Sequence, residues 1–421
     1  IARDHGIEKV WGVVLAENGL SYSITIDPLE GEKIERNIPL LASLIGVPSD
    51  ELVHRVKDIT KRNRAPVKLF KNADFRVFSV VEEHKSEFPG LGCVIEQRRS
   101  YPYGRAASHV IGYMGELTQN EFVTFGKTGG YYYGQSMGRD GIEKYYEKRL
   151  KGKNGTKFQV KNYLNRVMET KDSERIKPDP PEAGNSINLT IDIRLQLAAE
   201  QAFGDSTPGA LVALDPRNGE ILALVSLPSF DPNEFTRVMS ASRYDSLAGN
   251  PDKPLFNRAI QATYPPGSTF KMVTALAGLE NGFSRSSRFS PCHGSYFYGG
   301  RPFKCWKAGG HGSLDLPGAI ANSCNVYFYQ LGRAVGLEKW QKTGELLGIG
   351  ARTGIDIDDE VSGRLPTVEY YKTTDRYYSP GMMLNLAIGQ GENDVTIIQL
   401  AQYVGIIASE GIKAAPHLDK D

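Results

Sequence analysis

The sequence predicts an α+β protein of two parts: a non-catalytic, extended N-terminal pedestal domain over residues 1–185 and an α/β sandwich with an antiparallel sheet over residues 186–421. Three observations lead to this fold class. A polar, proline-rich stretch at 177–184 separates the two parts as a linker does. A β-hairpin pattern comes after this linker, and several helical patterns follow the hairpin. That order is expected when helices cover an antiparallel sheet.

The individual elements follow from periodicity and turn chemistry. In the first part, residues 12–27 alternate like a β ribbon. In the second part, residues 192–203 have helical periodicity with Asp192 as a candidate N-cap. Apolar strands at 209–214 and 220–225 flank a turn that contains Pro216 and an Asn-Gly pair. Further helices are predicted at 269–280, 318–322, 326–335 and 395–409.

The composition excludes some classes of function. The 421 residues suffice for two or three domains, each with its own core. Because 50 Lys and Arg residues balance 49 Asp and Glu residues, the net charge of +1 argues against a nucleic-acid-binding role. No run of 18 apolar residues occurs, so we expect either a soluble protein or a membrane anchor outside this sequence. Four cysteines are enough for one metal site or one disulfide bridge.

The strongest local pattern is the segment YPPGSTFK at 264–271. Its prolines and glycine stop the chain just before a helical run, which places Ser268 at or near a helix N-terminus. Lys271 comes three residues later, so its amine and the Ser268 hydroxyl share one helix face. A serine needs a base before it can act as a nucleophile, and a lysine with a lowered pKa can be that base. The S-x-x-K pattern is common, however, and by itself indicates only a helix start.

A second pattern, Ser323-Cys324-Asn325, follows about 50 residues later between two helical segments. In order, spacing and flanks, the pair resembles the S-x-x-K and S-x-N motifs of penicilloyl-serine enzymes. Further segments extend the resemblance along the chain, and as a whole it is similar to the class B penicillin-binding proteins of the cell-elongation machinery. They are RSYPYG at 99–104, HVIGY at 109–113, GIEKYYE at 141–147, residues 209–228, SFDPN at 229–233, GHG at 310–312, TGID at 353–356 and IGQG at 388–391.

The resemblance implies a DD-transpeptidase that cross-links peptidoglycan stem peptides and is inhibited by β-lactams. Ser268 is then the nucleophile and Lys271 its base, while Ser323 relays a proton to the leaving amine and Asn325 holds the substrate amide. It also implies a single-pass anchor in the bacterial inner membrane, a periplasmic catalytic domain, and two partners, a RodA-type SEDS glycosyltransferase and the scaffold MreC. The acyl transfer itself needs no cofactor. Two rival interpretations stay open: a β-lactamase or β-lactam sensor, and a scaffold that has lost catalysis.

The family's third motif, K-[ST]-G, has no convincing match. One string, at 127–129, precedes Ser268, whereas the motif should follow S-x-N by well over 100 residues. The other, at 342–344, comes only 17 residues after Asn325 and lies in a helical pattern. We therefore expect the motif strand beyond residue 421. The R-G-x-I-x-D-R-N-G run expected around or before residues 13–18 is also missing.

Three cysteines and a histidine lie between the two motifs or inside the second: Cys292, Cys305, His311 and Cys324. Thiolates and imidazole suit tetrahedral zinc, although these spacings are not those of a zinc finger. Some relatives similar to this protein carry zinc in this position, so a structural zinc ion next to S-x-N is one interpretation. A Cys292–Cys305 disulfide and plain buried thiols are the others. His293 is an alternative ligand, and Cys93 is predicted to lie in a half-buried strand.

Overall fold

The computed structural model describes residues 12–27, 34, 37–46, 48–62, 67–73, 75–88, 90–126, 128–132, 135–156, 178–204, 207–236, 241–374 and 376–420. Lys127 of the first K-T-G string and residue 177 of the predicted linker lie outside them. The chain forms two compact units. The first combines residues 1–139 with 230–249, and the second combines 140–229 with 250–421. The single domain boundary at residue 185 stays a prediction.

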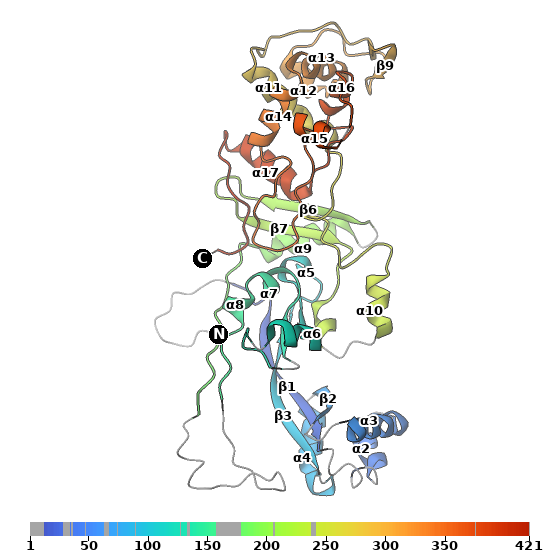
Figure 1. Cartoon of the computed structure of the whole chain (residues 1–421), viewed down its shortest axis with the longest axis vertical. Coiled ribbons are helices and arrows are strands. Elements are labelled where there is room, and N and C mark those ends of the chain that lie inside the picture. Colours follow the sequence, from blue (N-terminus) through green and yellow to red (C-terminus); the bar gives the residue numbers. More distant parts are fainter. Residues whose placement is uncertain are drawn as a thin grey trace. The chain divides into compact units, whose positions relative to one another are not determined.

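The first unit is built on a three-stranded antiparallel sheet of order β2-β1-β3 (Figure 1). Its strands are β1, Glu17–Ile26, β2, Val67–Ala73, and β3, Leu91–Ser100. Their core includes Ile24 and Ile26 together with apolar residues of the helices α2, Ile38–Ile45, α3, Ser49–Arg62, and α4, Phe75–Glu83. The alternating pattern at 12–27 therefore forms a strand that begins at Glu17, and Cys93 lies half-buried in β3 as predicted.

Shorter elements complete the first unit. They are η2, Lys85–Glu87, α5, Ser108–Ile111, β4, Met114–Glu116, α6, Gln119–Glu121, η3, Phe122–Gly126, β5, Ser136–Gly138, η4, Pro232–Thr236, and α10, Ala241–Ala248.

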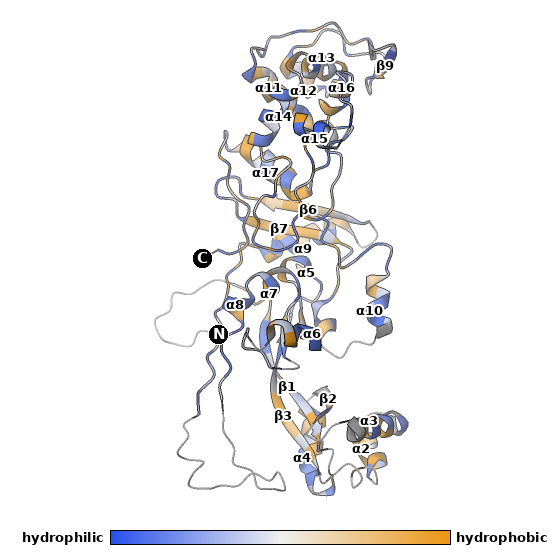
Figure 2. Cartoon of the chain, viewed as in Figure 1, coloured by the Kyte–Doolittle hydropathy of each residue, from blue (hydrophilic) through white to orange (hydrophobic). Residues whose placement is uncertain are grey.

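The second unit contains an antiparallel hairpin of β6, Gly209–Leu214, and β7, Ile221–Leu227. The helix α9, Ile193–Phe203, packs on Leu211 and Val225, while α17, Ile397–Ala408, packs along β6. Figure 1 shows these two helices on either side of the hairpin, and Figure 2 shows that the hairpin is largely apolar. An apolar hairpin needs cover on both faces. The predicted combination of helices with an antiparallel sheet is therefore confirmed.

Helix α9 is tied to the hairpin by a buried side chain. The amide of Gln196 donates to the carbonyl of Leu224 at 2.9 Å and accepts from the N–H of the same residue at 2.8 Å. Asp192 caps the helix by accepting a hydrogen bond from the N–H of Arg194, as predicted. A buried backbone N–H and C=O both find partners in this way, so the edge of β7 is satisfied by a side chain.

A helical cluster completes the second unit around α11, Lys271–Glu280. Its other elements are α7, Gly141–Tyr145, α8, Glu147–Leu150, η5, Gly267–Phe270, β8, Ser295–Tyr298, β9, Arg301–Lys304, α12, Leu316–Ala321, α13, Asn325–Val335, α14, Leu337–Leu346, α15, Val368–Thr373, and α16, Met382–Leu386. All four helices predicted here occur, with ends displaced by at most two residues. Within the described ranges, no helix has the length and apolar character needed to cross a membrane.

Candidate active site

Ser268 lies in the short helical turn η5, which continues directly into α11. Two backbone hydrogen bonds between Tyr264 and Val395 hold the segment that precedes it. Gly267 adopts a φ of 60°, and its N–H donates to the carbonyl of Gly389 at 2.8 Å. A Cβ atom on Gly389 would lie 2.2 Å from the Gly267 carbonyl oxygen, so the close backbone approach requires glycine there. The predicted position of Ser268 near a helix N-terminus is confirmed.

The Lys271 amine lies at the centre of the site. Its Nζ is 3.1 Å from Ser268 Oγ, 2.8 Å from both Oγ and the carbonyl oxygen of Ser323, and 2.7 Å from Asn325 Oδ1. Four oxygens thus surround a nitrogen that has at most three protons to donate. The longest of these contacts is to Ser268, whose hydroxyl can instead donate to a neutral amine. The structure brings together all four residues selected from the two sequence motifs.

Burial sets the protonation of this lysine. Only 3% of the Lys271 surface is exposed, although its side chain carries a group that is normally charged. Removing the ammonium from water lowers the pKa of Lys271 to about 8, and the neighbouring Cys305 and Cys324 act against that change. An appreciable fraction of the amine is therefore neutral near neutral pH, which is what a base requires.

Ser323 is held in an unusual backbone conformation between α12 and α13. Its φ of 47° lies in the left-handed region, which a serine adopts only at a cost of about 1–3 kcal/mol. Its carbonyl accepts from Lys271 at 2.8 Å and from the indole N–H of Trp306 at 3.1 Å. Asn325 opens α13, and its side-chain amide donates to the carbonyl of Lys304 at 3.4 Å. The S-x-N motif is therefore fixed from both sides by hydrogen bonds.

A cysteine and histidine cluster lies directly behind this motif. The ligand atoms of Cys292, Cys305, His311 and Cys324 all lie within 4.8 Å of one another. His311 Nδ1 is 3.7 Å from the sulfur of Cys292 and 3.6 Å from that of Cys305. Ligands of a tetrahedral zinc ion lie about 3.3–3.8 Å apart when metal–ligand bonds are about 2.0–2.3 Å long. The four side chains predicted as a metal set therefore meet, and the two His311–sulfur distances lie within this range.

Backbone pairing produces this convergence. Cys292 and Gly312 exchange two hydrogen bonds, and the Cys305 N–H donates to Gly294, so the β8–β9 hairpin returns Cys305 to the position of Cys292. All three cysteines are buried thiols without a disulfide. Burial alone would raise the pKa of Cys305, but nearby backbone N–H groups lower it, whereas burial raises the pKa of Cys324 to about 12. Burial also lowers the pKa of His311 and so favours the neutral imidazole that metals bind.

Two contributors to the site were missed by the sequence analysis. Trp306 is 65% exposed, and its indole N–H also donates to the carbonyl of Asn322 at 3.1 Å. In the sequence, only its position next to Cys305 could have indicated that Trp306 lies at the site. Gly389 supports the segment that carries Ser268, although it lies 121 residues away in the sequence. Its segment, residues 388–391, was noted only as part of the family resemblance, since no local pattern indicates which loop will contact Gly267.

Family models match both parts of the chain. Residues 209–421 match the penicillin binding protein transpeptidase domain, and residues 7–189 match the penicillin-binding protein dimerisation domain. The peptidoglycan D,D-transpeptidase MrdA of Acinetobacter baumannii is 34% identical over 414 residues, which cover 97% of this chain and 60% of that protein. The chain thus spans less than two thirds of this relative.

Solved structures give the same result. The penicillin-binding protein PBP2 of Helicobacter pylori, in a complex with MreC, superimposes with a TM-score of 0.85 at 30% identity over 97% of this chain and 76% of that one. A chain of a peptidoglycan synthase complex, described for its coordination of polymerization and crosslinking, superimposes with a TM-score of 0.73 at 28% identity. This superposition covers 98% of this chain and 70% of that one.

The fold and the serine–lysine site define a penicillin-binding transpeptidase domain joined to a dimerisation domain. The chain belongs to the class B penicillin-binding proteins, in the group of penicillin-binding protein 2 and MrdA.

Proposed function

We propose that this chain is the extracytoplasmic part of a peptidoglycan DD-transpeptidase that cross-links stem peptides during cell elongation. The observation that carries the proposal is the buried Lys271 amine, 3.1 Å from Ser268 Oγ and in contact with Ser323 and Asn325. Acyl transfer through a serine requires a nucleophile, a base of lowered pKa, and polar groups next to that base. The named relatives and the transpeptidase family model support the same reaction.

The reaction proceeds in two acyl transfers. The Lys271 amine takes the Ser268 proton while Ser268 Oγ attacks the carbonyl of the penultimate D-alanine of a stem peptide. Collapse of the tetrahedral intermediate breaks the peptide bond, and the terminal D-alanine leaves with a proton delivered through Ser323. An amine from a second stem peptide then attacks the ester, loses its proton to the same base, and frees Ser268. Asn325 holds the amide of the donor peptide.

A labelled penicillin tests this proposal, because a β-lactam carries the same kind of acyl group. We expect a stable adduct with one label per chain, lost in Ser268→Ala and formed at the normal rate in Ser313→Ala, a matched exposed serine of the same unit. Rapid release of hydrolysed label would instead indicate a β-lactamase. A folded protein that forms no adduct would indicate a scaffold, and either result would overturn the proposal.

We further propose that Cys292, Cys305, His311 and Cys324 hold one zinc ion with a structural role. Three thiolates and an imidazole make a closed tetrahedral set, which is typical of structural rather than catalytic zinc. When bound, the ion supplies bonds that tie the β8–β9 hairpin to Cys324, the middle residue of the S-x-N motif. Because Ser323 adopts a left-handed φ, such a tie would stabilise a conformation that the chain alone disfavours.

Metal content decides this second proposal independently of activity. Protein purified without chelators should contain about one zinc ion per chain, as expected for a closed four-ligand site. Cys292→Ser should lose most of the zinc, whereas Cys93→Ser, which changes a cysteine of the other unit, should retain it. Metal-free protein with Cys292 and Cys305 joined by a disulfide would refute it.

The partners and the location are also proposals. The H. pylori relative was solved with MreC, and a further relative belongs to a peptidoglycan synthase complex, so we infer an MreC-type scaffold and a SEDS glycosyltransferase as partners. We place the catalytic domain in the periplasm, with an inner-membrane anchor outside this chain.

Ile95 on β3 is 58% exposed and is a candidate contact for the scaffold. Ile95→Arg should weaken co-purification with MreC more than Val123→Arg, an exposed apolar residue of η3; equal effects would contradict that contact.

A further inference from the structure

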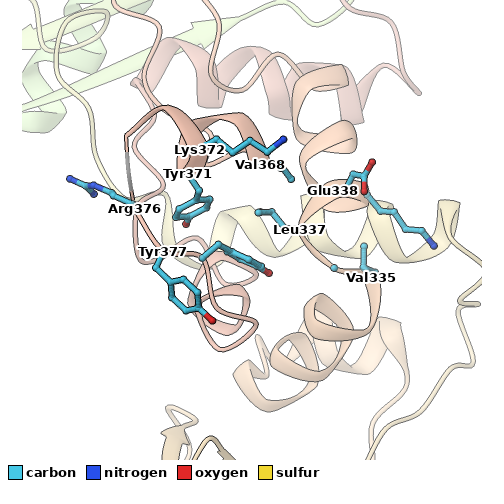
Figure 3. Close-up of a pocket in the computed structure, with 11 residues that line it drawn as sticks. Val335, Leu337, Glu338, Val368, Tyr371, Lys372, Arg376 and Tyr377 are labelled. Atoms are coloured by element: carbon cyan, nitrogen blue, oxygen red, sulfur yellow. The ribbon is translucent and has the colours of Figure 1, made fainter.

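A pocket of about 590 Å³ lies in the helical part of the second unit, away from the residues of the candidate active site. It opens between the corner where α13 gives way to α14 and the helix α15 with the segment after it. Figure 3 shows Leu337 and Tyr371 facing each other across this space. Its volume falls within the range of about 300–1,000 Å³ that is usual for small-molecule sites.

Helix α13 separates the pocket from the reaction centre. The helix begins at Asn325, which contacts Lys271, and ends at Val335, which lines the pocket. Ten residues of α-helix at about 1.5 Å each place the two ends about 15 Å apart. A small group bound at the Val335 end of α13 therefore does not reach the reaction centre at the Asn325 end. The pocket is thus separate from the candidate active site.

The pocket wall combines aliphatic side chains with tyrosine rings. Val335, Leu337 and Val368 supply the aliphatic surface, and Tyr371 and Tyr378 supply aromatic rings. Tyr371 is 4% exposed, and its buried hydroxyl makes no hydrogen bond of normal geometry. Burial, followed by a side-chain hydrogen bond to the Glu392 carboxylate and its negative charge, raises the pKa of Tyr371, so the hydroxyl keeps its proton. The polar group that this hydroxyl faces is therefore the Glu392 carboxylate, one oxygen of which is also buried without a regular hydrogen bond.

Charged groups around the opening favour an anion. Lys339 and Lys372 line the pocket, and among the described residues neither ammonium has a carboxylate partner. Glu338 is the single acidic residue of the lining. Arg376 is already paired with Glu392 at 2.6 Å, and Figure 3 shows its guanidinium pointing away from the pocket. The excess of positive charge, together with the aliphatic wall and the tyrosines, fits a ligand with carboxylates on a small, partly apolar body.

We propose that this pocket binds a short acidic peptide, and, on the basis of the function proposed above, that a peptidoglycan stem peptide is the ligand. The aliphatic wall would contact alanine methyl groups, and Lys372 would pair with a carboxylate. The pocket is then a second peptide site of the transpeptidase domain, distinct from the one in which the scissile bond reacts.

The test uses N-acetyl-L-alanyl-γ-D-glutamyl-meso-diaminopimelate, which carries three carboxylates and has no D-alanyl-D-alanine bond. Binding is measured by titration calorimetry on the whole chain, with Ser268 either free or acylated by a penicillin. We expect the tripeptide to bind both forms equally. Lys372→Glu should weaken binding at least tenfold, whereas Lys342→Glu, an exposed lysine of α14 outside the pocket lining, should change it less than twofold. If no penicillin adduct forms, the proposed function fails, but the titration of the free chain still tests the pocket.

The inference is overturned if the tripeptide does not bind, if acylation of Ser268 abolishes binding, or if Lys342→Glu weakens binding as much as Lys372→Glu. Equal binding of the fully amidated, carboxylate-free tripeptide would also overturn it.

Discussion

Raising the pH from 6 to 9 should accelerate the acylation of Ser268 by a penicillin, because only the neutral Lys271 amine can accept the serine proton. Burial lowers the pKa of this lysine to about 8. The neutral fraction at that pKa is about 1% at pH 6, about 9% at pH 7, about 50% at pH 8 and about 90% at pH 9. The second-order rate constant should therefore rise about ninefold from pH 6 to 7, about fivefold from 7 to 8 and less than twofold from 8 to 9.

Stopped-flow fluorescence with a labelled penicillin gives this rate constant directly, with the reagent's own hydrolysis measured in parallel. Lys271→Arg should lower the rate by about 10²–10⁴ at every pH, since a guanidinium stays charged and cannot act as a base. Lys307→Arg, which changes an exposed lysine nearby, should leave the profile unchanged. A wild-type rate that is flat between pH 6 and 9, or a Lys271→Arg variant with a normal rate, would refute the role of Lys271 as the base.

Three further predictions concern stability and backbone packing. Because the pKa of Lys271 is lowered from 10.5 to about 8, the unfolded chain binds more protons between these values. Stability against urea should therefore rise with pH across that window, by up to about 3 kcal/mol relative to Lys271→Met, and a parallel course of the two proteins would contradict this. Gly389→Ala should slow acylation at least tenfold, because the new Cβ atom would clash with Gly267. In Gly391→Ala, where a Cβ atom would meet no atom nearer than 3.5 Å, the acylation rate should stay within about threefold of the wild-type rate. Equal effects of the two substitutions would argue against the clash. Asp192→Ala should cost about 1 kcal/mol in urea unfolding by removing the cap of α9, and an unchanged midpoint would show that the cap contributes nothing.

Local elements were predictable wherever a short stretch of sequence carries its own physical reason. The Asn-Gly turn between two apolar strands predicted the β6–β7 hairpin, and the Pro-Pro-Gly stop predicted the helix start at Ser268. The spacing of Ser268 and Lys271 was enough to predict their contact, because residues three apart on a helix lie on one face. The weaker prediction was the length of the first strand, since alternation at 12–16 extends beyond the residues that pair.

Several decisive features depend on contacts between distant parts of the chain. The partners Ser323 and Asn325 are assigned to Lys271 by motif resemblance in the sequence, but only folding brings them within 2.8 Å of its amine and buries that amine. The support that Gly389 gives to Gly267 and the pocket beside Tyr371 leave no signal in the local sequence.

The sequence by itself therefore predicted the candidate reacting groups, the helices and hairpin that carry them, and the cysteine and histidine set behind them. Only the tertiary structure decided the lowered pKa of Lys271, the convergence of Cys292, Cys305, His311 and Cys324, and the second pocket. The physical reason is the distance along the chain over which each effect acts. Periodicity and turn chemistry act over a few neighbouring residues, whereas burial, and with it desolvation, depends on which distant segments pack together.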